Sequence, residues 1–256
     1  MIKLFRKIRQ KLLSENKFSK YFIYAFGEII LVVIGILIAL QINNWNEQRK
    51  LEQQESTYYC KIKEDISSDL FNIQRSKKSL DERQKTTKRL LTNLLKIQDN
   101  KSIIMKDYLA SLRSYIYVPN KSAITDVTSS GKLENLKNED LKNAILNYYS
   151  EQEYALNVIG SNQNNLNEKI FDYEDYSGFG IQELPLYQTI YGDELQSLFT
   201  SIDWHKDPNN MLFIHLKNHM NMNMILCQRE KQLITDIERK AMELRDSLQS
   251  YCIPND

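Results

Sequence analysis

The sequence predicts an all-α protein in which a single N-terminal transmembrane helix continues into a long stalk helix and is followed by an antiparallel helical bundle. Three observations support this prediction. Residues 21–45 are almost entirely apolar and follow a strongly basic N-terminus. The whole chain contains only seven Gly and four Pro among 256 residues. Apolar residues also recur every three or four positions, which is the period of a packed helix rather than of a strand.

Residues 1–20 predict a basic amphipathic helix on the cytoplasmic side of a membrane. They contain seven basic side chains and one acid, and Ile2, Phe5, Ile8 and Leu12 recur at helical spacing. Such a helix lies on an anionic lipid surface, with its apolar side toward the lipid. Because the whole chain has a net charge of +1, residues 21–256 carry −5. The basic charge is confined to this tail, which argues against nucleic acid as a partner.

Residues 21–45 predict an uncleaved signal anchor. At 1.5 Å per residue this segment spans roughly 37 Å, which is enough to cross a bilayer. Its end, Ala39 to Trp45, lacks the small residues of a cleavage site. Positive residues beside a span are retained in the cytoplasm, so residues 46–256 are expected to form an extracytoplasmic helical domain.

Within that domain the spacing predicts two long helices with shorter ones between them. No Pro or Gly interrupts the chain from Trp45 to Asp99, so the membrane helix is expected to run on through this stretch. The second long helix is expected to begin at Asp207-Pro208, with Asp as N-cap and Pro at the first helical position. Its apolar spacing is typical of a coiled-coil-like helix that packs along a partner. The shorter helices are predicted at 102–118, 122–130 and 138–173.

Two stretches resemble an uncharacterised bacterial family of single-pass membrane proteins. The first is GEIILVVIGILIALQINNWNE at 27–47, and the second combines Ser130-Gly131-Lys132-Leu133 with the paired tyrosines Tyr148 and Tyr149. The resemblance covers residues 1 to about 155. It implies a membrane anchor with a helical extracytoplasmic domain, which in a bacterium lies in the periplasm, and it brings no activity, cofactor or site residues.

Glu28 lies within the apolar segment, and two interpretations of it stay open. An acid inside a membrane is costly and is often placed for proton or ion traffic. Near the cytoplasmic interface, beside Lys20, it would merely be solvated. Gly35 and Ala39 share its helix face and form a small-xxx-small pattern that permits close helix contact. Self-association through this face is therefore plausible.

Residues 171–207 are predicted to form a loop that combines aromatic and acidic side chains. Aromatic residues give large contact areas at modest entropic cost, so this loop is a candidate partner-binding surface. The alternative is that the aromatic side chains attach the loop to the bundle core. The candidate contact residues are Tyr173, Tyr176, Tyr187, Tyr191 and Trp204.

His215 and His219 are four residues apart, a spacing that can chelate a metal, and several methionines lie nearby. The sequence HLKNH lacks the Glu of a zinc peptidase, and ordinary helix residues are the simpler interpretation, so no metal site is predicted.

The three cysteines allow a disulfide on an oxidising side of the membrane. On one continuous helix Cys227 and Cys252 would be about 37 Å apart, too far to bridge. Cys60 and Cys252 could pair if the last helix returns alongside the stalk.

No nucleophile elbow, phosphate loop or redox Cys pair is present in the sequence. We therefore expect a protein without enzymatic activity or cofactor, a scaffold, adaptor or sensor-like interaction module of the inner membrane. Its expected partners are lipid and another envelope protein or a second copy. The alternative is an accessory subunit of a proton-coupled or transport complex that uses Glu28.

Overall fold

The computed structural model describes residues 18–113, 115, 117–171, 176–200 and 202–252. The basic tail predicted at 1–20 lies almost wholly outside the described residues. Described residues form helices and no strand, so the predicted all-α class is confirmed. The chain divides into two units, Met1–Ser56 and Thr57–Asp256. One long helix, α2 (Phe18–Leu95), contributes to both units.

In the first unit, α2 carries its apolar side chains exposed on all sides. An 18-residue window has a mean hydropathy of 2.6, and none of it is buried by the protein. Ile29 and Leu37, which are 60% and 59% exposed, illustrate this pattern. A helix that is apolar all round and uncovered by protein matches the requirements of a membrane span. Among the described residues, one helix, α2, is long enough and apolar enough to cross a membrane.

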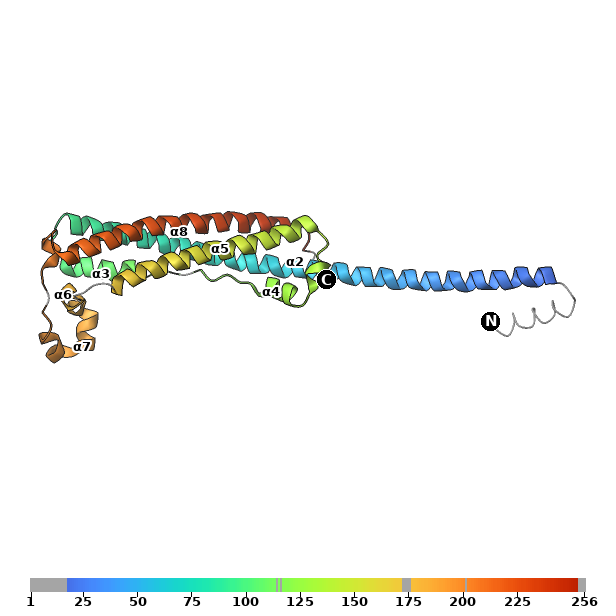
Figure 1. The fold of residues 1–256 in the computed structure, drawn as a ribbon, viewed down its shortest axis with the longest axis horizontal. Coiled ribbons are helices and arrows are strands. Elements are labelled where there is room, and N and C mark those ends of the chain that lie inside the picture. Colours follow the sequence, from blue (N-terminus) through green and yellow to red (C-terminus); the bar gives the residue numbers. More distant parts are fainter. Residues whose placement is uncertain (1–17, 114, 116, 172–175, 201, 253–256) are drawn as a thin grey trace. The chain divides into compact units, whose positions relative to one another are not determined.

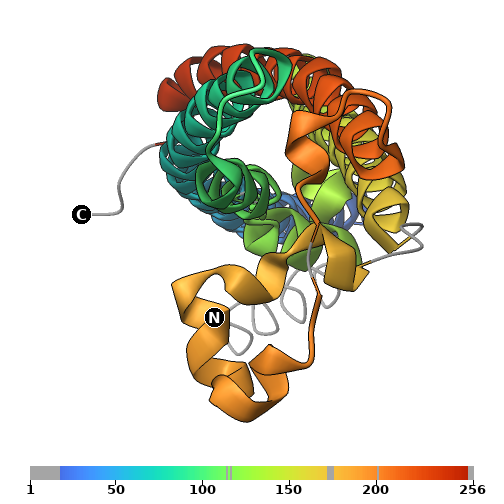
Figure 2. The same cartoon turned by 90° about the vertical axis from the view of Figure 1, so that its left-hand side faces the viewer.

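The second unit is a helical bundle (Figure 1). Besides the second part of α2, its elements are α3 (Lys101–Ser111), α4 (Ser122–Ser129), η1 (Lys132–Asn135), α5 (Glu139–Phe171), α6 (Tyr176–Phe179), η2 (Ile181–Glu183), α7 (Pro185–Ser197), η3 (Trp204–Lys206) and α8 (Met211–Gln249). Viewed along the bundle, α2, α5, α8 and α3 surround a common interior, and α6 and α7 lie outside it (Figure 2).

The helices α2 and α8 pack antiparallel and share a buried polar layer. Arg83 on α2 donates to Asn223 Oδ1 through Nε at 2.9 Å and to Glu230 Oε2 through Nη1 at 3.0 Å. All three side chains are at most 5% exposed. Buried charges require such paired and hydrogen-bonded surroundings. Because few other alignments pair these groups, this layer fixes the register of α8 on α2.

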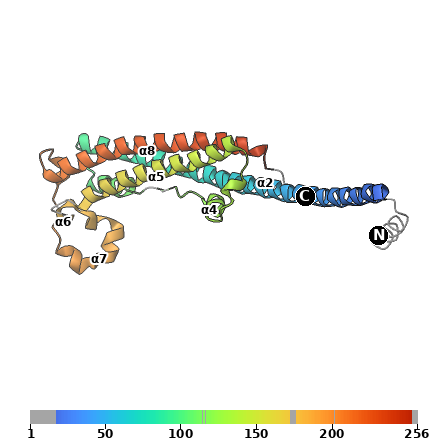
Figure 3. The same ribbon diagram turned by 45° about the vertical axis from the view of Figure 1, so that its right-hand side comes forward.

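Beside α2, α5 and α8, the fourth position of the bundle is filled in succession by α3, by residues 112–121, whose described members are not helical, and by α4 (Figure 1 and Figure 3). The helix predicted at 102–118 was wrong in its extent, because α3 ends at Ser111. The Ser111 carbonyl accepts from Asn223 Nδ2 at 3.2 Å, and the backbone N–H of Tyr115 donates to Ser79 Oγ at 3.2 Å. These tertiary hydrogen bonds replace those that a longer helix would make.

The backbone of the non-helical stretch is held by polar side chains of α2. Asp69 Oδ1 accepts from the N–H of Asn120 at 2.7 Å, and Asp65 Oδ2 accepts from the N–H of Ala123 at 2.8 Å. Asp65 therefore caps the first turn of α4 from a different helix, and its charge also suits a helix N-terminus. Backbone groups inside a bundle require such partners.

The long C-terminal helix begins later than predicted. Asp207 is not its N-cap, because Asp207 Oδ1 accepts from the N–H of Asn209 at 2.9 Å within a turn. Asn210 caps α8 instead, accepting from the N–H of Leu212 at 2.9 Å. Asn210, the second of two asparagines after the proline, is also a favoured N-cap residue, and the Asp-Pro pair alone did not indicate that the helix starts there.

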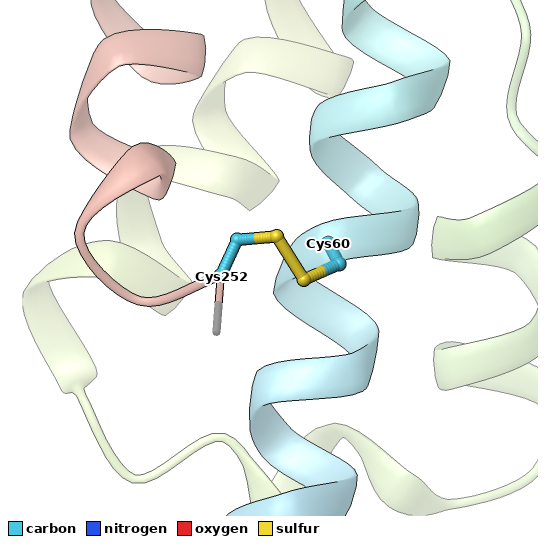
Figure 4. The surroundings of a disulfide bond; sticks show 2 residues. All are labelled: Cys60 and Cys252. Carbon is cyan, nitrogen blue, oxygen red and sulfur yellow. A yellow bond between two sulfur atoms is a disulfide. The ribbon is translucent and has the colours of Figure 1, made fainter. Parts of the chain in front are cut away.

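The disulfide joins Cys60 on α2 to Cys252 just beyond α8, the pair favoured from the sequence (Figure 4). The two Cα atoms are 4.7 Å apart, within the usual range for a disulfide. Tyr59 and Tyr251 pack edge to face beside it, with ring centroids 5.7 Å apart. The bond therefore ties the C-terminal end of the bundle to α2 across 192 residues of sequence.

We expect reduction of this disulfide to destabilise the bundle, because the bond restricts a very long loop in the unfolded chain. The chain-entropy estimate for such a loop is on the order of 5 kcal/mol. The thermal unfolding midpoint of the full chain in detergent, followed by circular dichroism, should fall when a reductant is added. The Cys60→Ser/Cys252→Ser variant should have the lower unfolding midpoint without reductant, and adding reductant should not change it. Equal sensitivity of both proteins would contradict the prediction.

A second prediction concerns Asp69, which is fully buried. Burial raises the pKa of its carboxyl, and this effect exceeds the lowering by hydrogen bonds from Asn120, Tyr117 and Gln152. The folded protein therefore holds this proton more tightly than the unfolded chain. The resulting stabilisation is complete below the unfolded-state value of 3.8 and is lost as the pH rises through the raised folded-state pKa.

The measurement is the stability of the wild type minus that of Asp69→Asn as a function of pH. This difference should grow as the pH falls from about 7 toward 4, because the variant lacks the titrating group. Asp126→Asn, on the exposed side of α4, is the control and should leave the wild-type pH profile unchanged. A difference that shrinks on acidification would show that the carboxylate, not the acid, is favoured in the fold.

Candidate partner-binding surface

The region predicted as a loop at 171–207 is partly helical in its described residues, which corrects that prediction. It contains α6, η2, α7 and η3. Pro185 occupies the first position of α7, where its missing N–H has no helical partner to lose. Gly180 enters η2 with φ +92°, a left-handed conformation that other residues rarely adopt. Gly192 interrupts α7 with φ 71°.

Two stacked aromatic rings fix this region to the bundle. The rings of Phe179 and Trp204 are parallel within 2°, with centroids 4.9 Å apart. Trp204 Nε1 donates to the Phe179 carbonyl at 2.9 Å, so the indole satisfies its one polar group. Tyr108 of α3 packs edge to face on Phe179 at 5.3 Å. These contacts join the start and the end of the region to a hydrophobic core that also contains Leu90, Ile104 and Leu216.

The α7 helix itself is not buried at any residue. It and the residues that follow expose five large aliphatic side chains. We call these the α7 surface: Leu186 (64% exposed), Ile190 (70%), Leu195 (45%), Leu198 (76%) and Ile202 (45%). A single exposed Leu is ordinary, whereas several on one short segment indicate an interaction site.

The charge around the α7 surface is negative. The described residues from 176 to 205 contain four acids and no Lys or Arg. Lys101 of α3 reaches Glu183 at 3.2 Å, and Lys206 reaches Asp203 at 3.2 Å. Asp193 and Glu194 on α7 are exposed. The segment that bears the α7 surface therefore exposes both aliphatic and acidic side chains.

The aromatic residues predicted to form the surface have different roles. Trp204 is 1% exposed and belongs to the core, so its assignment to a partner surface was wrong. Tyr187 is half-buried and packs against the same core. Tyr191 is 38% exposed and packs edge to face on Phe199 at 5.3 Å. Tyr173 lies outside the described residues, and of Tyr176 only its place in α6 is described.

The aliphatic residues of the α7 surface were missed in the sequence. Leu186 and Ile190 are four residues apart and directly follow Pro185, a usual start of a helix. That signal was present, but the surrounding glycines and aromatic residues favoured an irregular loop.

The residues proposed for helix packing all lie on the first part of α2. Glu28 is partly exposed, whereas Gly35 and Ala39 are fully exposed. A Cβ added at Gly35 would meet no atom within 4 Å. The face is therefore uncovered within one chain, as a helix-contact face requires.

The two histidines line a groove of about 620 Å³ between α5 and α8. His215 is exposed and His219 is buried. Burial lowers the pKa of His219 to about 4 and outweighs a backbone hydrogen bond with Leu166, which raises it. The imidazole is therefore neutral at ordinary pH. Within the residues that the structure describes, no three His, Cys, Asp or Glu side chains are placed to share a metal ion.

The fold and this surface define a class: helical-bundle proteins with one N-terminal helix that is apolar enough to cross a membrane. A family of unknown function, DUF6090, matches residues 28–177, more than half of the chain, and the protein belongs to this family. The predicted membership of an uncharacterised family is thus confirmed. Neither a search of curated proteins nor one of solved structures found a match. The matched region ends before α7, so family membership says nothing of the α7 surface.

Proposed function

We propose that this protein is a non-enzymatic, single-pass inner-membrane protein that acts as a scaffold, adaptor or sensor-like interaction module in the cell envelope. One observation carries the proposal: the aliphatic side chains of the α7 surface are exposed although the segment that bears them is attached to a well-packed core. A fixed segment that exposes apolar side chains loses little conformational entropy when it binds. Partner binding is the function that this arrangement supports best.

The proposed topology places the N-terminus in the cytoplasm and the helical bundle in the periplasm. Two features support it. The basic tail favours retention on the cytoplasmic side. The disulfide between Cys60 and Cys252 suits an oxidising compartment, whereas the cytosol keeps thiols reduced. Both features support a bundle on the periplasmic side of the membrane.

The proposed partner is another envelope protein whose contact surface combines apolar and basic side chains. The apolar component follows from Leu186, Ile190 and Leu198, each more than half exposed. The basic component follows from charge complementarity, because residues 170–205 contain no Lys or Arg. A well-packed aliphatic anchor is worth about 1.5–3 kcal/mol when fully buried, so two or three of them would dominate the interface.

The test compares Ile190→Glu with Gln188→Glu in the full chain, tagged at its C-terminus and purified from native membranes in mild detergent. Both residues are exposed on α7, so both variants should fold, but only the first places a charge in the apolar contact. Ile190→Glu should lower the amount of co-purified partner at least tenfold, which corresponds to about 1.4 kcal/mol. Gln188→Glu should retain it.

Mass spectrometry and native mass then identify what is bound. A partner retained equally by both variants would show that the α7 surface is not the contact. A homo-oligomer alone would replace the envelope protein by a second copy of this chain.

Glu28→Gln separates the proposal from proton coupling. The substitution keeps the shape of the side chain and removes its charge. We expect unchanged membrane level, unchanged co-purified partner and unchanged growth relative to the wild type, with the gene deletion as reference. A growth defect like that of the gene deletion, at normal membrane level and assembly, would instead assign Glu28 to proton traffic in a larger complex.

A further inference from the structure

The helix α2 ends at an isoleucine with a strained backbone. Ile97 has a φ of +50°, in the left-handed region that β-branched residues rarely adopt. Its N–H donates to the Leu94 carbonyl at 3.1 Å, and the N–H of Gln98 donates to the Asn93 carbonyl at 3.1 Å. These two hydrogen bonds define a Schellman motif, in which Gly or Asn usually occupies the position of Ile97. The helix end is therefore ordinary in its hydrogen bonds and unusual in its residue.

The turn between α2 and α3 also exposes aliphatic side chains. It lies at the end of the bundle away from the C-terminus (Figure 1). We call three of its side chains the turn surface: Leu95 (58% exposed), Ile97 (46%) and Ile103 (40%). Ile97 is thus unfavourable twice, in its backbone conformation and in its incomplete burial. Because a Gly would avoid both costs, the strain indicates a function for the exposed side chain.

The charge of the turn is positive. The chain from Leu95 to Lys106 contains three Lys and one Asp. The acid, Asp99, forms an ion pair with Lys206 at 3.0 Å. Lys96 and Lys106 are exposed. The turn therefore presents aliphatic and basic side chains together, which complements a partner that is apolar and anionic.

The size of the turn favours lipid over protein as this partner. A specific protein interface buries about 800 Å² on each side. Here five residues connect α2 to α3, and every residue from Leu95 to Asn100 is exposed. A lipid surface needs no complementary pocket, because single aliphatic side chains can enter its acyl region while lysines stay among the anionic head groups.

We propose that the turn surface binds an anionic phospholipid surface. Leu95, Ile97 and Ile103 enter the acyl region, and Lys96 and Lys106 contact the phosphate groups. The left-handed conformation of Ile97 is retained because its side chain serves this contact rather than the fold. The site goes beyond partner binding at the α7 surface and does not depend on it.

The first measurement tests whether Ile97 serves the fold. Ile97→Gly and Ile97→Asn both place a residue that tolerates the left-handed conformation at this position. Their thermal unfolding midpoints, followed by circular dichroism of the full chain in detergent, should equal or exceed that of the wild type by up to about 3 °C. Ile225→Asn makes the same change at an exposed position within α8. It should not raise the midpoint, because Ile225 carries no such strain.

The second measurement is binding to vesicles. The full chain is placed in nanodiscs that contain phosphatidylglycerol, so that the basic tail at 1–20 is already occupied by its own bilayer. Sucrose-loaded vesicles of phosphatidylcholine, alone or mixed with phosphatidylglycerol, are added and sedimented. Nanodiscs without the protein give the background. The protein found in the pellet as a function of lipid concentration gives the vesicle affinity.

The wild type should sediment with the anionic vesicles and not with phosphatidylcholine alone. Ile97→Asn should lower the vesicle affinity about tenfold, which corresponds to about 1.4 kcal/mol. Lys96→Gln should lower it about fivefold. The matched controls Ile225→Asn and Lys78→Gln change exposed residues outside the turn and should bind as the wild type does.

Four results would overturn the proposal. No sedimentation of the wild type with anionic vesicles would leave a protein as the occupant of the turn surface. Equal affinities of the wild type and Ile97→Asn would exclude insertion of this side chain. Equal binding to both kinds of vesicle would exclude recognition of anionic lipid. Lower unfolding midpoints of both Ile97 variants would show that the side chain serves the fold.

Discussion

The constraint on which the bundle depends is that non-helical backbone occupies its fourth position and must be hydrogen-bonded there. The helix α2 meets this requirement with a stripe of polar side chains at four-three spacing: Asp65, Asp69, Asn72, Ser76 and Ser79. Each of them contacts the stretch between α3 and α4 or the start of α4. Between these residues α2 carries apolar side chains such as Ile66 and Ile73 for the core. The helix therefore has two distinct inner faces, one for backbone and one for side chains.

This division also explains the unusual polar content of the interior. Asp69 is held without a cationic partner among the described contacts, supported by the N–H of Asn120 and by Gln152, so burial dominates its pKa. In the neighbouring layer Arg83 pairs with Glu230, and no residue that the structure describes donates to Glu230 Oε1. Both features follow from the presence of non-helical backbone where a helix could have packed. A helix would have hydrogen-bonded its own backbone groups and filled the space with side chains.

Much of the fold could be predicted from the sequence where one period extends over many residues. The apolar spacing of α2 and α8 predicts two long helices, and the helix predicted at 138–173 is found as α5. Prediction failed where tertiary hydrogen bonds decide the outcome, as at the end of α3 and at Asp207. For the candidate site, aromatic composition indicated the right region but the wrong residues, because Trp204 and Phe179 pack on each other and leave the contact face to aliphatic neighbours. No local pattern tells a buried tryptophan from an exposed one.

The packing of Trp204 on Phe179 nevertheless keeps the aliphatic side chains of the α7 surface exposed. Without that attachment, exposed leucines and isoleucines in a chain segment of this length would collapse onto the nearest apolar groove, because burial of each is favourable. The stacked rings, the indole hydrogen bond to the Phe179 carbonyl and the Lys101–Glu183 pair hold both ends of the segment. Collapse is therefore restrained, and the apolar side chains stay in water. Burial of these side chains by a partner would release the free energy that folding of this chain does not, and the neighbouring acidic residues favour a partner with basic side chains.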